Sequence, residues 1–211
     1  TGGDDLTFLK ATTRTKSSPQ SGFSVEVFQE ATQAQISGSI AMSQDMIDAG
    51  ESIHLMEGSK SLVFETTMGD SLAKVQNKLN TAIESSNMNL DVFFDAMGRL
   101  NVVHKDYGSE STFSVISSTS GVLSERADIP SWVQNGLDVQ GTIGGEVCEG
   151  NGQILTGAEG TNVEGLKIRY TGVADPMNPE VGRVVLDSNA LTFQIGGNHN
   201  QVAKVLLPNT R

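Results

Sequence analysis

Apolar and polar residues alternate along most of this chain, with the period of two that is typical of strands half-buried in antiparallel sheets. The first alternating stretch spans residues 22–41. Its apolar positions are Phe23, Val25, Val27, Ala34, Ile36 and Ile40. Residues 51–66 predict two strands joined by a hairpin turn at 58–60, and residues 43–49 fit either one helical turn or a loop.

One segment has the period of a helix instead. Its apolar residues follow one another at spacings of three and four and so share a face: Leu72, Val75, Leu79 and Ile83. Asp70 is suited to be the N-cap, because its carboxylate can accept hydrogen bonds from the free amides of the first turn. The sequence therefore predicts an α-helix over about residues 70–86.

Residues 89–105 predict a strand, a turn near Met97 and Gly98, and a second strand, and residues 111–118 predict another strand. Strands, a helix, a hairpin and a further strand form an α+β unit with one helix on an antiparallel sheet. The alternation breaks over residues 119–136, which we interpret as a connection between modules. Trp132 in this connection could stack on a ligand, but burial at the junction is the favoured interpretation.

Residues 137–211 are predicted to be β throughout, with a final hairpin turning at 187–189 and one more strand before Pro208. The predicted fold class is α+β, mainly β, made of small antiparallel modules. Composition agrees with this, because only 5% of residues are aromatic and cores must be built mainly from Val, Ile, Leu and Ala. Thin cores of this kind suit small β modules better than one thick α/β enzyme core.

Charge and chemistry narrow the possible partners. The net charge is −11 and the fourteen basic residues are scattered, which disfavours nucleic acid. No apolar run is long enough for a membrane span, and no signal peptide opens the chain. The single cysteine, Cys148, has no partner for an internal disulfide, and we interpret it as a small residue on a strand.

The glycine-rich stretch at residues 141–160 raises the question of a phosphate-binding loop. Such a loop needs a lysine near its end and a helix after it, whereas this stretch has no lysine and carries Glu146, Glu149 and Glu159. We therefore predict tight turns around residues 149–152 and 157–160, joining strands into hairpins.

Few residues are candidates for catalysis or metal binding. His54, His104 and His199 belong to no His-Glu-x-x-His helix, and we expect the first two to face solvent on strands. Asp45, Asp48 and Glu51 lack the order of an EF-hand calcium loop. No Gly-x-Ser-x-Gly motif occurs. We assign no catalytic, cofactor-binding or metal-binding residue, and we expect no enzymatic activity.

The segment "VQGTIGGEVCEGNGQILTGAEGTNVEGLKIRYTG" resembles the short β module inserted in bacterial flagellins and in the flagellar filament-cap protein. That module runs as Gly-Thr-Ile-Asn-Gly-Glu, a Gly-x-Gly-Gln turn, Leu-Thr-Gly and Gly-Leu before a strand. The matching residues here lie at 141–146, 151–153, 155–157 and 165–166. Gly144 replaces the usual Asn, and Cys148 stands where a small Ala is usual.

A second segment, "LTFQIGGNHNQ" at residues 191–201, resembles the Leu-x-x-Gln-Ile-Gly-Ala-Asn-x-x-Gln segment of flagellin, with departures at Gly197 and His199. The cap protein lacks this segment, so the resemblance favours flagellin. Residues 70–100 are also similar to the helix-and-hairpin portion of inserted flagellar domains, and residues 22–35 to their opening strand.

The resemblance implies a structural, extracellular subunit of the bacterial flagellar filament that assembles with other flagellin subunits through terminal helices absent here. It implies stalk segments at residues 1–21 and 184–211, an outer α+β domain at 22–136 and a flagellin-insert β module at 137–183. The alternatives are a cap or hook-associated protein, an adhesive surface-binding module, and an enzyme inserted into a flagellin. We expect this chain to be monomeric or weakly self-associating.

Overall fold

The chain folds into two compact units. The computed structural model describes residues 5–186, 190–194 and 202–206, with only the backbone described in the last two segments. Unit 1 comprises the first thirty residues together with Val139–Arg211, and unit 2 comprises Ala31–Asp138. Unit 2 is therefore an insertion within unit 1.

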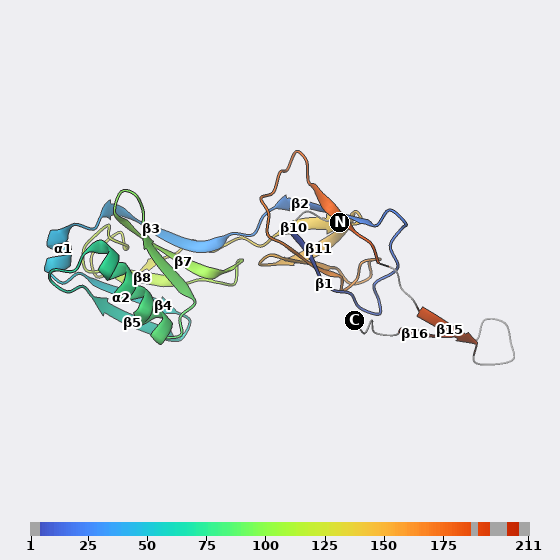
Figure 1. Cartoon of the computed structure of the whole chain (residues 1–211), viewed down its shortest axis with the longest axis horizontal. Coiled ribbons are helices and arrows are strands. Elements are labelled where there is room, and N and C mark those ends of the chain that lie inside the picture. The colour runs from blue at the N-terminus through green and yellow to red at the C-terminus, as the bar shows by residue number, and fades with distance from the viewer. Residues whose placement is uncertain (1–4, 187–189, 195–201, 207–211) are drawn as a thin grey trace. The chain divides into compact units, whose positions relative to one another are not determined.

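Unit 2 contains two antiparallel sheets and two helices (Figure 1). The three-stranded sheet has the order β3 (Gln33–Ala41), β7 (Arg99–Tyr107), β6 (Leu90–Phe94). The four-stranded sheet has the order β5 (Lys60–Glu65), β4 (Ser52–Glu57), β8 (Ser114–Ser117), β9 (Ser131–Trp132). The helices are α1 (Gln44–Asp48) and α2 (Leu72–Ser85).

One hydrophobic core joins both sheets of unit 2 to helix α2. The buried face of α2 consists of Val75, Leu79 and Ile83, at the spacing that the sequence predicts. These side chains share the core with residues from both sheets, among them Ile53, Leu55, Leu90, Val92, Leu100 and Val102. The helix lies against β5 and β6, the outer strands of the two sheets. The predicted α+β arrangement, mainly β with one packed helix, is confirmed.

The start of α2 differs from the prediction. The N-cap is Ser71, whose hydroxyl accepts a hydrogen bond from the Lys74 amide, and not Asp70. Asp70 is almost fully buried, and its carboxylate instead lies 2.8 Å from Lys74 Nζ and 2.5 Å from Lys78 Nζ. Two ammonium groups are stronger partners for a buried carboxylate than backbone amides, and the smaller Ser71 fills the cap.

Unit 1 contains a seven-stranded antiparallel sheet and a separate hairpin. The order in the sheet is β1 (Leu6–Lys10), β13 (Lys167–Tyr170), β12 (Ile154–Gly157), β11 (Glu146–Asn151), β10 (Gln140–Ile143), β2 (Phe23–Gln29), β14 (Glu180–Val184). Strands β15 (Ala190–Gln194) and β16 (Val202–Leu206) pair only with each other. The interior of the sheet is aliphatic: Val25, Val27, Val139, Ile143, Leu155, Val163, Leu166 and Ile168 are fully buried.

The glycine-rich stretch forms hairpins, as predicted, but their tight turns lie at residues 144–145 and 152–153 and not at the predicted 149–152 and 157–160. Strands β10 and β11 are joined by Gly144 and Gly145, which both have positive φ, as a two-residue type I′ turn requires. Strands β11 and β12 are joined by Gly152 and Gln153. The connection after Gly157 is longer than a tight turn, because β13 begins only at residue 167.

Long-range pairing in unit 1 differs from the sequence-based expectations. The predicted final hairpin around residues 187–189 is wrong, since β14 pairs with β2 and β15 pairs with β16; the turn itself lies outside the described residues. Strand β2, expected in the outer domain at 22–136, belongs to unit 1. Strand β1 lies within the expected stalk segment 1–21 but pairs with β13. A stalk role for either end of the chain stays a prediction.

Asp70 makes the stability of unit 2 dependent on pH. The hydrogen bonds from Lys74 and Lys78 outweigh burial and hold the pKa of this carboxyl below its ordinary value. Its contribution is thus present above the unfolded pKa of about 4 and is lost as pH falls through the folded pKa. We expect Asp70→Asn to lower Tm at pH 7, with a difference from wild type that shrinks below about pH 4. Thermal melts between pH 7 and pH 2.5 measure this, with Asp128→Asn as the exposed control; a constant difference would contradict it.

Gly157 permits a close approach of two segments in unit 1. A Cβ at this position would lie 1.9 Å from the carbonyl oxygen of Val163. We expect Gly157→Ala to destabilise unit 1 by about 1–3 kcal/mol, because the backbone must shift to admit the methyl group. Urea unfolding measures the effect. Glu159→Ala, on the exposed loop that follows, should change stability by less than about 0.5 kcal/mol, and equal effects of the two changes would refute the explanation.

Candidate interaction surface at the seam of the seven-stranded sheet

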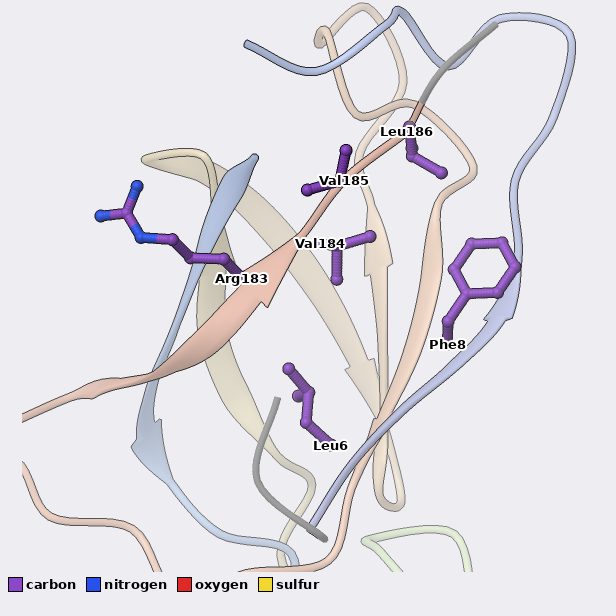
Figure 2. A pocket seen from close by; sticks show the side chains of 6 residues that line it. All are labelled: Leu6, Phe8, Arg183, Val184, Val185 and Leu186. Carbon is purple, nitrogen blue, oxygen red and sulfur yellow. The ribbon is translucent and has the colours of Figure 1, made fainter. Parts of the chain in front are cut away.

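The seven-stranded sheet curls until its two outer strands, β1 and β14, face each other without pairing. An open pocket of about 270 Å³ lies between them. It is lined by Leu6, Phe8, Arg183, Val184, Val185 and Leu186, shown in Figure 2. The sheet thus resembles a barrel whose two outer strands are not joined by a hydrogen-bonded ladder.

The seam is apolar, with a single charge at its border. Leu6 and Val184 point into the space between the strands, whereas Arg183 extends away from it (Figure 2). The guanidinium of Arg183 is held by Glu180 at 2.8 Å. Ser18 fixes the end of the seam, because its backbone and hydroxyl exchange hydrogen bonds with Leu186. This surface offers apolar contact area, but no arrangement of groups for acid–base or nucleophilic chemistry.

The two histidines within the described residues make separate contacts. His54 Nε2 lies 2.8 Å from the hydroxyl of Ser61, and His199 is outside the described residues. The expectation that His104 faces solvent is wrong, since its side chain is buried. The Asp106 amide donates to His104 Nδ1 at 3.0 Å, so Nε2 carries the proton and donates to Glu57 at 3.0 Å. Both ring nitrogens are satisfied, which makes burial possible.

Two of the three acidic candidates, Asp48 and Glu51, are occupied by structural hydrogen bonds. Asp48 accepts from the Gly69 amide and the Gln44 side chain, which lower its pKa. Glu51 is buried and accepts from the amide and hydroxyl of Thr119. Burial raises the pKa of the Glu57 carboxyl, but hydrogen bonds from the Asn89 amide, Lys60 and His104 outweigh it and leave the pKa below its ordinary value. Among the described residues, no three His, Cys, Asp or Glu side chains form a group that could hold a metal ion.

Cys148 is partly buried on β11, the strand position that the sequence predicts. Burial raises the pKa of its thiol to about 11, and the nearby Glu146 adds to this effect. A thiol with so high a pKa is a poor nucleophile at neutral pH.

Trp132 is 79% exposed, so the expected burial at a module junction is wrong. It lies on the two-residue strand β9, opposite Ser114 of β8. The neighbouring Val133 is buried instead, because alternate residues of a strand point to opposite faces. Phe93 is also exposed, whereas Phe94 packs against the core of unit 2. The sequence contains no signal that distinguishes the two faces of so short a strand.

Comparison with known proteins gives a fold but no family. No family model matches the sequence, and no curated protein matches it. Among solved structures, the chain is similar to the D2-D3 domains of the flagellar cap protein FliD from Serratia marcescens, in two crystal forms. The TM-scores are 0.56 and 0.53, both at 13% identity, and each match covers 87% of this chain and 100% of the other.

The same domains of FliD from Escherichia coli match with a TM-score of 0.49 at 12% identity, over 82% of this chain and 91% of that one. The Serratia comparison shows that this chain has a fold found in a component of the flagellum. No helix within the described residues is both long enough and apolar enough to cross a membrane.

The Glu57 carboxylate accepts hydrogen bonds from the His104 ring on β7 and from the backbone amide of Asn89, which precedes β6. We expect Glu57→Ala to destabilise unit 2 by about 1–3 kcal/mol, because the His104 Nε2–H and the Asn89 amide lose their acceptor. Chemical denaturation measures the loss. Glu65→Ala removes an exposed carboxylate from the same β4–β5 hairpin and should change stability by less than about 0.5 kcal/mol. Comparable losses in both variants would show that Glu57 has no special role.

Proposed function

We propose that this chain is the outer part of an extracellular flagellar cap-type protein, with a structural role and no enzymatic activity of its own. The fold comparison carries the proposal, since both units together match the whole of the Serratia D2-D3 fragment. The β module at residues 139–172 adds to it, because that module resembles one present in flagellar proteins. The fold comparison thus favours what the sequence analysis held as an alternative.

The topology of unit 1 suits a protein that presents a domain outward. Unit 2 leaves unit 1 after β2 and returns to it at β10, and these two strands are paired neighbours, with Gln29 opposite Gln140. An insertion whose two ends emerge side by side does not disturb the sheet that holds it. Unit 1 can therefore contact other flagellar subunits through its own surface, while unit 2 extends its contact area.

A flagellin filament subunit is the second candidate. The segment at residues 191–201 favours it through the resemblance to flagellin; its first residues belong to β15, and residues 195–201 lie outside the described residues. A flagellin would be present along the whole filament, whereas a cap would be present only at its end.

Antibodies raised against residues 31–138 distinguish the two candidates. Under the proposal, immunogold labelling of intact cells decorates only the distal end of each flagellar filament. Labelling along the filament length would establish the flagellin alternative, and labelling away from flagella would refute both. Preimmune serum is the control. Stoichiometric zinc in the purified protein would contradict the non-enzymatic role.

A further inference from the structure

Unit 2 protects most of its outer strands against pairing with other chains. Helix α2 covers β6: the side-chain amide of Asn80 donates to Val92 O and accepts from Val92 N, and Gln76 accepts from the Phe94 amide. These bonds replace the main-chain partners that another strand would supply. A capped outer strand cannot extend its sheet.

The opposite side of unit 2 is closed by the segment at residues 119–136. The Gly121 carbonyl accepts hydrogen bonds from the Ser39 and Ile40 amides of β3, and Gln134 forms a bridge with Gln35. The outer strand of the four-stranded sheet on this side, β9, has only two residues. A loop that covers an outer strand and a very short outer strand each prevent edge-to-edge association of sheets.

Strand β5 is the exception: helix α2 lies against it as well as against β6, but no side chain of the helix donates to or accepts from the main chain of β5 within the described residues. It pairs with β4 over all six of its residues without a register shift and contains no proline. Within the described residues, no hydrogen bond from a side chain reaches the main chain of β5. Val63 at its centre is 61% exposed, and the flanking Leu62 and Phe64 are only half-buried although they contact the core. A regular, uncapped strand edge with apolar residues at its centre is a template for another strand.

We propose that β5 pairs with β5 of a second copy of this chain, antiparallel about a two-fold axis at Val63. A two-fold axis perpendicular to the sheet is the operation that pairs one strand antiparallel with its own copy. This rotation also keeps every residue on its original face of the sheet. Because directly opposed residues of paired strands point to the same face, their residue numbers must both be odd or both be even. With the axis at Val63, Leu62 lies opposite Phe64 of the second copy. The half-buried apolar residues of both copies then cover each other.

The charges of β5 favour this partner over an unrelated strand. The strand begins with Lys60 and ends with Glu65. Antiparallel pairing places the basic end of each copy beside the acidic end of the other, whereas parallel pairing would bring like charges together. The net charge of −11 opposes association over longer distances, so salt should strengthen the dimer by screening it. This interface goes beyond the proposed function and does not depend on it.

Sedimentation equilibrium of the full chain tests the proposal at concentrations up to about 1 mM. We expect a monomer–dimer equilibrium for wild type that Val63→Lys weakens on the order of tenfold or more, because it places two ammonium groups together at the axis. The matched control is Val147→Lys, an exposed valine on β11, which is paired on both sides. A wild type that stays monomeric throughout, or a Val63→Lys dimer as strong as wild type, would overturn the proposal.

Cysteine cross-linking tests the register, in a Cys148→Ala background. Opposed residues of antiparallel strands have Cα atoms about 5 Å apart, within the range of a disulfide. We expect Val63→Cys to form a covalent dimer rapidly under mild oxidation. Ser61→Cys should react much more slowly, because the two copies of residue 61 are offset by four residues, about 13 Å along the strands. Faster cross-linking of Ser61→Cys than of Val63→Cys would exclude this axis.

Discussion

The antiparallel pairing of β2 with β10 and β14 is the interaction on which the organisation of this chain depends. It joins residues near 25, 142 and 182 in one sheet, and so encloses all of unit 2 between two neighbouring strands. The entropy cost of closing a loop grows only slowly with its length, so a folded insertion of this size is tolerated if the ladder at its base holds. The buried Val25 and Val27 of β2 anchor that ladder.

Glycine allows these strands to lie close together. A Cβ at position 141 would lie 2.2 Å from the Glu26 carbonyl, and one at position 22 would lie 3.0 Å from the Val184 carbonyl. Gly22 also has a positive φ of 79°, which other residues rarely adopt. The abundant glycines of this chain thus permit tight turns and the close approach of strands. Those at residues 141–160 form hairpins and not a phosphate-binding loop.

Local elements could be predicted from the sequence, because their determinants lie within a few residues of each other. The hairpin at Gly58 and the buried face of α2 follow from periodicity and turn chemistry, and so does the presence of hairpins in the glycine-rich stretch, although not the positions of their turns. Pairing between distant segments could not, since β2 alternates in the same way whichever strand lies beside it. Burial of His104 depends on its hydrogen bond to Glu57, which is 47 residues away. The residues around His104 in the sequence do not reveal this partner. Exposure of Trp132 likewise depends on which face of β9 meets the core.

The aromatic side chains contribute little to the cores of the two units. Among those whose burial is described, only Phe23, Phe113 and Tyr170 are buried. The exposed ones are Phe8, Phe28, Phe93, Tyr107 and Trp132. Aliphatic residues hold each unit together, so the large rings remain available for contacts with other molecules.

The two units treat their strand edges differently, and this difference bears on assembly. Unit 1 curls its sheet until β1 and β14 face each other across an apolar seam, so neither edge is free to extend into a flat sheet. Unit 2 caps β6 and β3 by side chains and a loop, whereas within the described residues no side chain caps the main chain of β5. A protein selected only to stay soluble would gain from a charge at the centre of that strand. Because Val63 occupies this position and the charges stand at the two ends, the edge has the pattern of a specific contact rather than of a protected surface.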